Sequence, residues 1–204
     1  GATTQEITPK YSSYSCIKND ATGQKVGELS WNHNTNILTI EGTIFIDGDV
    51  RFDDEGQRVN YVGRGVIFAG DDVEFDEQVC AGAAPNGSLR TCYNDPSDWD
   101  PDTNLMTVIS DGWSEYDQGL NLGFPGVYQG IIYAKNFCLI HEDFRSSGPV
   151  ICDEIRIEEN DEDVQSGFPT FYSWPALQQA LPEALTFVAN GETTLEIELL
   201  EQTG

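Results

Sequence analysis

The sequence is poor in positive charge and in histidine. Ten Lys and Arg residues stand against 35 Asp and Glu residues, so the formal net charge is −25, and only two histidines are present. A surface of this charge repels nucleic acid and anionic lipid headgroups, and it attracts cations and basic partners. The sequence also has no Gly-x-Ser-x-Gly elbow, phosphate-binding loop or dinucleotide fingerprint. These absences exclude nucleic acid as a partner and argue against the common hydrolase and nucleotide-binding classes.

Long apolar runs are missing as well. No stretch of 18 apolar residues occurs, so the sequence predicts no membrane-spanning helix. No signal peptide is visible, and the chain opens at Gly1 without methionine, which we interpret as a mature or trimmed chain. Hydrophobic residues make up 39% of the 204 residues and aromatics 11%, which is a globular composition with enough length for a sizeable core.

Most of the chain consists of short β-branched and aromatic segments bounded by Gly, Asn and Asp, and four of them share one pattern. The pattern begins with Gly and any second residue. An aliphatic residue, an aromatic or aliphatic residue and a small or aliphatic residue follow, and a turn ends it. It occurs at residues 42–47, 65–70, 130–135 and 148–153. A second short strand follows each copy. The copies start 23, 65 and 18 residues apart, and the longest gap would hold about three repeats of this size.

These repeats predict an all-β fold, a parallel β-helix (β-solenoid), because short strands bury their apolar side only by stacking in successive coils. Its inward ladder is expected to include Ile44, Ile67, Ile132 and Val150. We expect an N-terminal segment and first cap over residues 1–30, the β-solenoid over 31–166, and a C-terminal cap and β-hairpin over 167–204. The alternative is a β-sandwich, which also has many short, evenly spaced strands.

Five cysteines are present, and none has the Cys-x-x-Cys spacing of a zinc site. Cys80 and Cys92 bracket a loop rich in Gly, Pro and Asn, which predicts a disulfide and an oxidising compartment. One further pair is expected among the remaining three. Cys138–Cys152 is the leading choice because these residues lie on successive repeats, and Cys16 is the alternative partner for either.

A second repeat relates residues 31–40 to residues 99–108, each a Trp followed by Asn or Asp, Thr-Asn and a strand. Asp98, Asp100 and Asp102 alternate as at the start of a calcium-binding EF-hand loop, so they are candidate metal ligands, with Ca²⁺ the expected ion. However, the sixth position is Thr103 rather than Gly, and the twelfth is Ile109 rather than Glu. A structural turn held by Asn and Asp side chains is therefore favoured over a metal site.

Parallel β-helices also carry polysaccharide-cleaving enzymes, so we considered catalytic groups. Arg51, Arg58 and Arg64 lie near the acidic residues 47–54 and could face a groove, but salt bridges between coils are the favoured interpretation. A Ser-His-acid triad would need His33 or His141, and a turn-capping or exposed histidine is favoured instead. No catalytic residue is predicted.

The C-terminal segments suggest a cap and an assembly surface. The aromatic residues 167–175 are expected to plug the open end of the stack, with a carbohydrate or partner platform as the alternative. The pattern of residues 185–199 predicts a β-hairpin with its turn at Asn190-Gly191. This hairpin is a candidate edge for pairing with a strand of another subunit. The polar residues 1–15 are also expected to be ordered by a partner.

The motifs resemble, in order, those of bacterial secreted PilX-like proteins associated with type IV pilus assembly. The resemblance spans roughly residues 14–175 and is carried by the segments 38–50, 63–68, 99–105, 128–134, 147–150 and 167–169 together with Cys80-Ala81. It implies a right-handed parallel β-helix exported to the cell surface or a pilus, and it implies no catalytic residues. This chain departs from the family in lacking a hydrophobic N-terminal helix and in its unusually acidic turns, which suggest a salty habitat or a cation-bound surface.

The sequence therefore predicts a non-enzymatic, secreted or cell-surface structural or adhesive protein, specifically a pilus-associated or surface-filament subunit. Its expected partners are like subunits or pilus components, with carbohydrate or a cell surface as the alternative. No cofactor is expected apart from Ca²⁺ in the metal alternative. The rival functions are a carbohydrate-active β-helix enzyme and a cation-binding surface scaffold.

Overall fold

The protein is all-β in the part of the chain that the structure describes. The computed structural model describes residues 4–52, 58–75, 78–83, 89–92, 98–112, 120–122, 126–141, 144–158 and 170–172. Every regular element within these ranges is a β-strand. In the same ranges there is no helix of the length and apolar character needed to cross a membrane.

The fifteen strands of the described residues belong to one hydrogen-bonded network. In chain order they are β1 (Gln5–Glu6), β2 (Tyr14–Asn19), β3 (Lys25–Asn32), β4 (Ile37–Ile46), β5 (Val50–Phe52), β6 (Arg58–Ala69), β7 (Val73–Phe75), β8 (Gln78–Ala81), β9 (Leu105–Ser110), β10 (Leu120–Leu122), β11 (Val127–Gln129), β12 (Ile131–His141), β13 (Arg145–Ser147), β14 (Val150–Glu158) and β15 (Thr170–Tyr172). Most pairings are parallel. The exceptions are β2 with β3 and β3 with β4, which are antiparallel.

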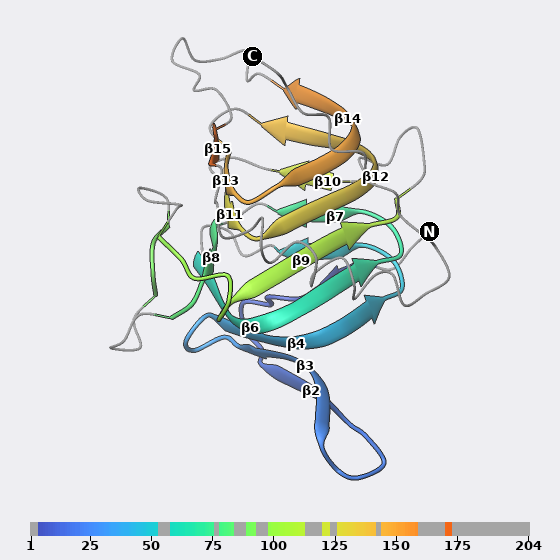
Figure 1. Ribbon diagram of the computed structural model, residues 1–204, viewed down its shortest axis with the longest axis vertical. Helices are drawn as coiled ribbons and strands as arrows, with labels where there is room; N and C mark the ends of the chain where they lie inside the picture. Colours follow the sequence, from blue (N-terminus) through green and yellow to red (C-terminus); the bar gives the residue numbers. More distant parts are fainter. Residues whose placement is uncertain are drawn as a thin grey trace.

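One side of the stack is the parallel series β4, β6, β9, β12 and β14, which succeed one another along the long axis (Figure 1). Its central ladder reads Ile44, Ile67, Val108, Ile132 and Val150. The middle three are fully buried, and the two terminal ones pack partly buried against the core. The parallel pairing of the Gly42 and Gly65 segments and the four predicted ladder residues are confirmed.

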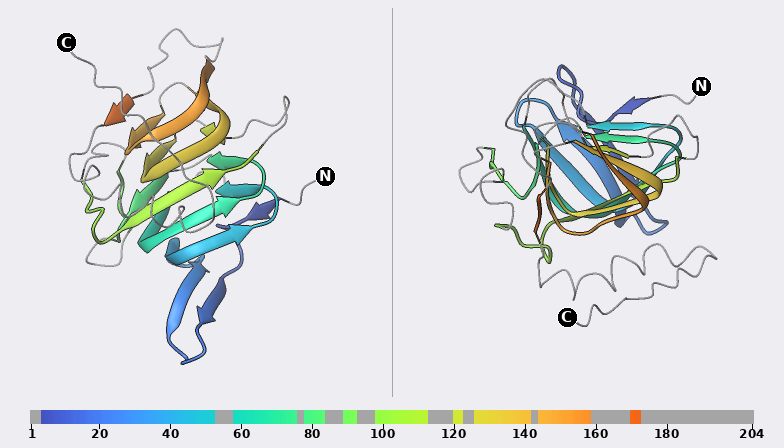
Figure 2. Two further views of the ribbon diagram at one scale, coloured as in Figure 1. Left: turned by 45° about the vertical axis from the view of Figure 1, so that its right-hand side comes forward. Right: turned by 90° about the horizontal axis from the view of Figure 1, so that it is seen from above.

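Two further series of parallel strands complete the network. One runs β1, β5, β7 and β10 to the second halves of β12 and β14. The other joins the start of β6 to β8, β11, β13 and β15. Seen along the stack, the series lie on different sides of a shared interior (Figure 2). Large side chains fill it, as where the Phe52 and Phe75 rings stack with centroids 4.5 Å apart.

At the N-terminal end, β2 and β3 form an antiparallel hairpin that adds to β4 and extends beyond the stack (Figure 1). The preceding segment joins the stack directly, because β1 pairs with β5 and the Ile7 amide donates to the Arg51 carbonyl at 3.0 Å. Ile7 is buried. Residues 4–8 are therefore ordered by their own chain, which corrects the prediction that a partner orders residues 1–15.

The 65-residue interval between the second and third repeats holds fewer coils than predicted. On this side only β9 lies between β6 and β12, since it pairs with both. On this side the interval therefore spans two steps from strand to paired strand, rather than the three repeats that its length predicts. The extra length lies in the connection from β8 to β9, which carries the loop closed by Cys80 and Cys92 and the second Trp turn.

At the C-terminal end, β15 pairs in parallel with β13. The strand series thus continues past residue 166, where we had placed the end of the stack. The remainder of the predicted cap at 167–175 and the predicted hairpin at 185–199 lie outside the described residues.

Two buried tyrosines make stability sensitive to high pH. Tyr61 donates its phenol proton to the Gln129 carbonyl, and Tyr128 donates to the Met106 carbonyl, each at 2.7 Å. Both side chains are fully buried, and this burial raises the pKa of each phenol well above its ordinary value. The folded state therefore holds these protons more tightly than the unfolded state.

We expect the free energy of unfolding to be unaffected by these two groups below about pH 10, where unfolded tyrosine also stays protonated. Above that pH it should fall by up to about 1.4 kcal/mol per pH unit for each tyrosine, because only the unfolded chain releases the protons. Urea unfolding at a series of alkaline pH values, with phenolate absorbance, measures this. The exposed Tyr11→Phe variant is the control and should keep the same slope, whereas a pH-independent wild type would contradict the prediction.

Candidate functional site

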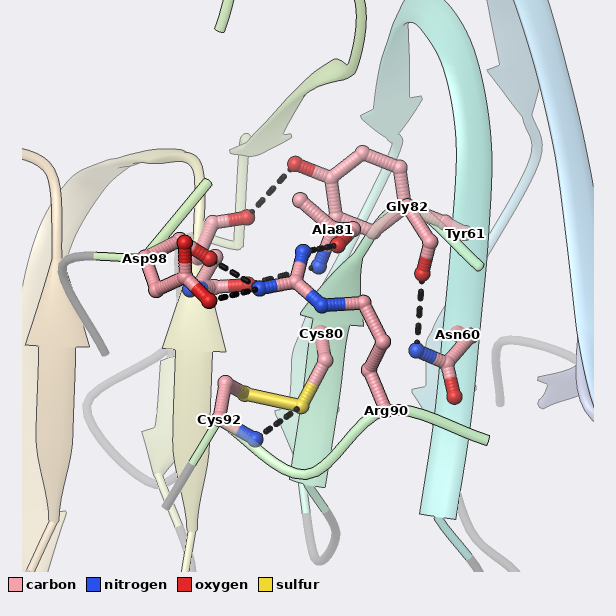
Figure 3. The surroundings of a disulfide bond; sticks show 9 residues. Asn60, Tyr61, Cys80, Ala81, Gly82, Arg90, Cys92 and Asp98 are labelled. Atoms are coloured by element: carbon pink, nitrogen blue, oxygen red, sulfur yellow. Dashed lines mark hydrogen bonds and ion pairs between the residues drawn. A yellow bond between two sulfur atoms is a disulfide. The ribbon is translucent and has the colours of Figure 1, made fainter. Parts of the chain in front are cut away.

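The Cys80–Cys92 disulfide closes the long connection after β8 (Figure 3). The two Cα atoms are 5.7 Å apart, both residues are fully buried, and the Cys92 amide donates to the Cys80 sulfur at 3.1 Å. The Arg90 guanidinium donates to the carbonyl oxygens of Ala81 and Asp98. It also forms an ion pair with the Asp98 carboxylate at 3.3 Å. Arg90 thus ties the loop to the end of β8 and to the start of the second Trp turn.

The second predicted disulfide is also present and joins the last two long strands. Cys138 on β12 and Cys152 on β14 have Cα atoms 6.0 Å apart. Cys138 is fully buried, and Cys152 packs partly buried against the core. Cys16, on the exposed hairpin, is the free cysteine. Both pairs that the sequence favours are therefore present: Cys138–Cys152 links two neighbouring strands, and Cys80–Cys92 closes a connection.

The predicted metal ligands Asp98, Asp100 and Asp102 serve the turn and do not converge on one point among the described residues. Asp98 pairs with Arg90. The Asp100 carboxylate accepts from the Asp102 amide at 3.0 Å and from the Thr103 hydroxyl at 2.6 Å. The Thr103 hydrogen bond is the main cause that lowers the pKa of Asp100, with the Asp102 amide adding to it. These contacts agree with the favoured interpretation, a structural turn.

The first Trp turn repeats one hydrogen bond of the second without the charges. The Asn34 amide donates to Asn32 Oδ1 at 3.0 Å, as the Asp102 amide does to Asp100 Oδ1. Both tryptophans are buried, and their ring N–H groups donate to the Pro9 carbonyl and to the Ser147 hydroxyl respectively. The same hydrogen bond therefore forms with either Asn or Asp at these positions.

An acidic corner that the sequence analysis missed consists of Asp49, Asp71 and Asp72. One carboxylate oxygen from each lies within 4.8 Å of the others, and all three side chains are partly buried. They meet because Asp49 precedes β5, Asp71 and Asp72 precede β7, and Val50 pairs with Val73. The aligned segments 49–52 and 72–75 were the available signal. Three close carboxylates repel one another, and a bound cation would relieve that repulsion.

Arg51, one of the three arginines considered for catalysis, is engaged in a contact between neighbouring strands of the stack. Arg51 Nε lies 2.6 Å from Glu74 Oε2, and these residues are register partners on β5 and β7. Lys135 on β12 likewise pairs with Asp111, which follows β9, at 2.6 Å. These are the salt bridges between coils that the sequence analysis favoured. The acidic residues 53–55 lie outside the described part of the chain.

A second feature that the sequence analysis missed is an open cleft of about 480 Å³ on the N-terminal hairpin. Its lining residues come from the segment before β2, from β2, β3 and β4, and from the first Trp turn. They are Ser13, Tyr14, Ser30, Trp31, Asn32, Asn34, Thr35, Ile37 and Thr39. At its edge the Ser13 hydroxyl lies 2.7 Å from His33 Nδ1 and also accepts from the His33 amide at 3.0 Å. Ser13 therefore links the segment before β2 to the first Trp turn.

Comparison with known proteins does not identify a function for this chain. No protein-family model, no curated protein sequence and no solved structure matches the chain.

Proposed function

We propose that this chain is a non-enzymatic structural or adhesive protein of the cell exterior, a subunit of a pilus or another surface filament, built as a right-handed parallel β-helix. The observation that carries the proposal is a parallel strand stack with two disulfides, one between β12 and β14 beside the core and one that closes the buried connection after β8. A stack of this kind stabilises itself coil by coil and presents long outer faces.

The β-helix is supported by the order of the pairings. Three parallel series surround one core, and each strand pairs with its counterpart about one coil away in the sequence. Right-handedness is what parallel strands joined by a crossover in one sheet adopt in nearly all proteins. The alternative β-sandwich would be built of antiparallel sheets, whereas antiparallel pairing here is limited to the β2–β3–β4 end of the described network.

An exterior location is supported by the disulfides and the charge. Disulfides form and persist in oxidising compartments. A net charge of −25 favours solvation at high salt, where repulsion between the carboxylates is screened. Pilus association is supported by the resemblance of the sequence motifs to PilX-like proteins, and a structural role by the use of Arg51, Arg90 and Lys135 in contacts that brace the stack.

The location is tested by labelling intact native cells with a membrane-impermeant biotin reagent and then shearing off surface appendages. We expect the protein to be labelled and to appear in the sheared fraction with Cys80, Cys92, Cys138 and Cys152 oxidised. Recovery from the cytoplasm with four reduced thiols would contradict an exterior location. Release of sugar fragments from polysaccharides by the purified protein would instead support the enzyme alternative.

The acidic corner favours a second candidate function, a cation-binding surface scaffold. Asp49, Asp71 and Asp72 come from two successive coils, so a Ca²⁺ ion held between them would join those coils. At a Ca²⁺ concentration a hundredfold above the dissociation constant, binding would stabilise the fold by about 2.7 kcal/mol.

This alternative predicts opposite effects of one substitution with and without the ion. In EDTA, Asp49→Asn should leave stability unchanged or raise it, because one repelling charge is removed. Thr4 Oγ1 donates to the Asp49 carboxylate, and it can donate in the same way to the amide oxygen of the new side chain. In Ca²⁺ the same variant should lose most of the stabilisation that Ca²⁺ binding gives to the wild type. Thermal melts at constant ionic strength measure both. Asp102→Asn is the matched control, and an equal Ca²⁺ response in the two variants would exclude the corner.

A further inference from the structure

The cleft on the N-terminal hairpin is uncharged although the protein is strongly acidic. Its nine lining residues offer hydroxyl and amide groups beside one aliphatic and two aromatic residues, and none carries a formal charge. The chain around it is neutral as well. Residues 1–36 contain three acidic residues, Glu6, Asp20 and Glu28, and three lysines, so the whole net charge of −25 falls on residues 37–204.

The neutrality of the cleft is not imposed by the local fold. The first Trp turn contributes Asn32 and Asn34 to the lining, and the second Trp turn builds the same hydrogen bond from Asp100 and Asp102. The turn therefore accepts either residue, and the copy that lines the cleft has Asn at both positions. In a protein with 35 acidic residues, two uncharged residues at positions that accept Asp are what a site for a ligand that disfavours negative charge would require.

The chemistry of the lining fits one class of ligand. Serine, threonine and asparagine each donate and accept hydrogen bonds, which matches the paired donor and acceptor character of sugar hydroxyls. The side chains of Asn34 and Thr39 make no hydrogen bond within the described residues, so they are available to a ligand. Ile37 adds an apolar contact for the C–H face of a sugar ring. A volume of about 480 Å³ lies in the usual range for small-ligand sites.

We propose that this cleft binds a neutral oligosaccharide through Asn34, Thr39 and the hydroxyl groups around them. A uronic acid or sulfated sugar is disfavoured, because the rest of the chain would repel it. The inference deepens the adhesive form of the proposed function by naming the ligand class. It is tested on the purified protein, so its failure and the failure of the surface location are separate results.

The test measures binding of immobilised dextran, mannan and N-acetylglucosamine oligomers, with polygalacturonate as the charged comparator. Thr39→Val removes a hydroxyl from the cleft, and Thr43→Val makes the same change on the same face of β4 outside it, four residues along. Asn34→Asp adds a charge that the turn tolerates, since Asp102 occupies the matching position. Far-ultraviolet circular dichroism melts establish that each variant is folded.

We expect at least one neutral glycan to bind and polygalacturonate not to bind. Thr39→Val and Asn34→Asp should each weaken binding by about tenfold, the effect of leaving one polar partner in a site unsatisfied, and Thr43→Val should bind as the wild type does. Absence of binding to every neutral glycan at millimolar concentration would overturn the proposal. Equal binding by all three variants, or retention of polygalacturonate at the wild-type affinity for neutral glycans, would overturn it too.

Discussion

Replacing Cys80 and Cys92 together by alanine is expected to lower the free energy of unfolding by about 3 kcal/mol, the value for a loop of this length in the chain-entropy model. The sequence separation is 12, and for Cys138–Cys152 it is 14, so the second pair should cost a similar amount. Removing both would cost about 6 kcal/mol, a large part of the 5–15 kcal/mol by which domains are usually stable. We therefore expect the quadruple variant to be largely unfolded at moderate temperature.

The matched control for the disulfide variants is Cys16→Ala. Cys16 is exposed on β2 and forms no disulfide, so its replacement should change stability by less than about 0.5 kcal/mol. Urea unfolding followed by tryptophan fluorescence compares all variants, with and without dithiothreitol. Reduction should bring the wild type to the stability of the quadruple variant. An effect of Cys16→Ala as large as that of either pair would show that the cysteines pair differently in solution.

The stack and its disulfides were predictable from the sequence because both depend on local repetition. The Gly-x-aliphatic segments each have a second strand 7 or 8 residues after the glycine, and their alignment places Ile44, Ile67 and Ile132 on one ladder. The loop between Cys80 and Cys92 is short and rich in turn residues, so its closure follows from a few adjacent residues. The number of coils between β6 and β12 did not follow, because an insertion within a coil lengthens the interval without adding a strand.

The acidic corner and the cleft were missed for a different physical reason. Asp49 and Asp72 come together only once the register of β5 on β7 is known, and the sequence analysis had aligned these strands without comparing the residues before them. The cleft joins Ser13 to Thr39 through two successive antiparallel pairings at the N-terminal end. The sequence predicts an N-terminal segment and first cap up to residue 30, with residues 1–15 ordered by a partner, and this expectation does not place Ser13 beside β4. Sites formed between strands depend on register, which a single repeat pattern does not reveal.

Register also determines the effect expected at Gly63, which lies within β6 between the half that pairs with β8 and the half that pairs with β9. Its φ is +95°, and a Cβ atom built there would lie close against the backbone oxygen of Ile40 on β4, its register partner. The Gly63 amide also donates to Asn104 Oδ1 at 3.0 Å, which fastens the second Trp turn to this strand. A side chain at this position would push β4 and β6 apart at the corner.

We expect Gly63→Ala to lower the free energy of unfolding by about 4 kcal/mol, which combines about 1–2 kcal/mol of left-handed strain with the cost of moving two paired backbones. Gly23→Ala separates these two contributions. Gly23 has a similar φ of +87°, but a Cβ atom there meets nothing within 4 Å. The free energy of unfolding of this variant should therefore fall only by the left-handed strain. Urea unfolding of both variants gives the difference. If Gly63→Ala costs no more than Gly23→Ala, then β4 and β6 are not tightly apposed at this corner, and the coil geometry on which the proposed β-helix depends is wrong there.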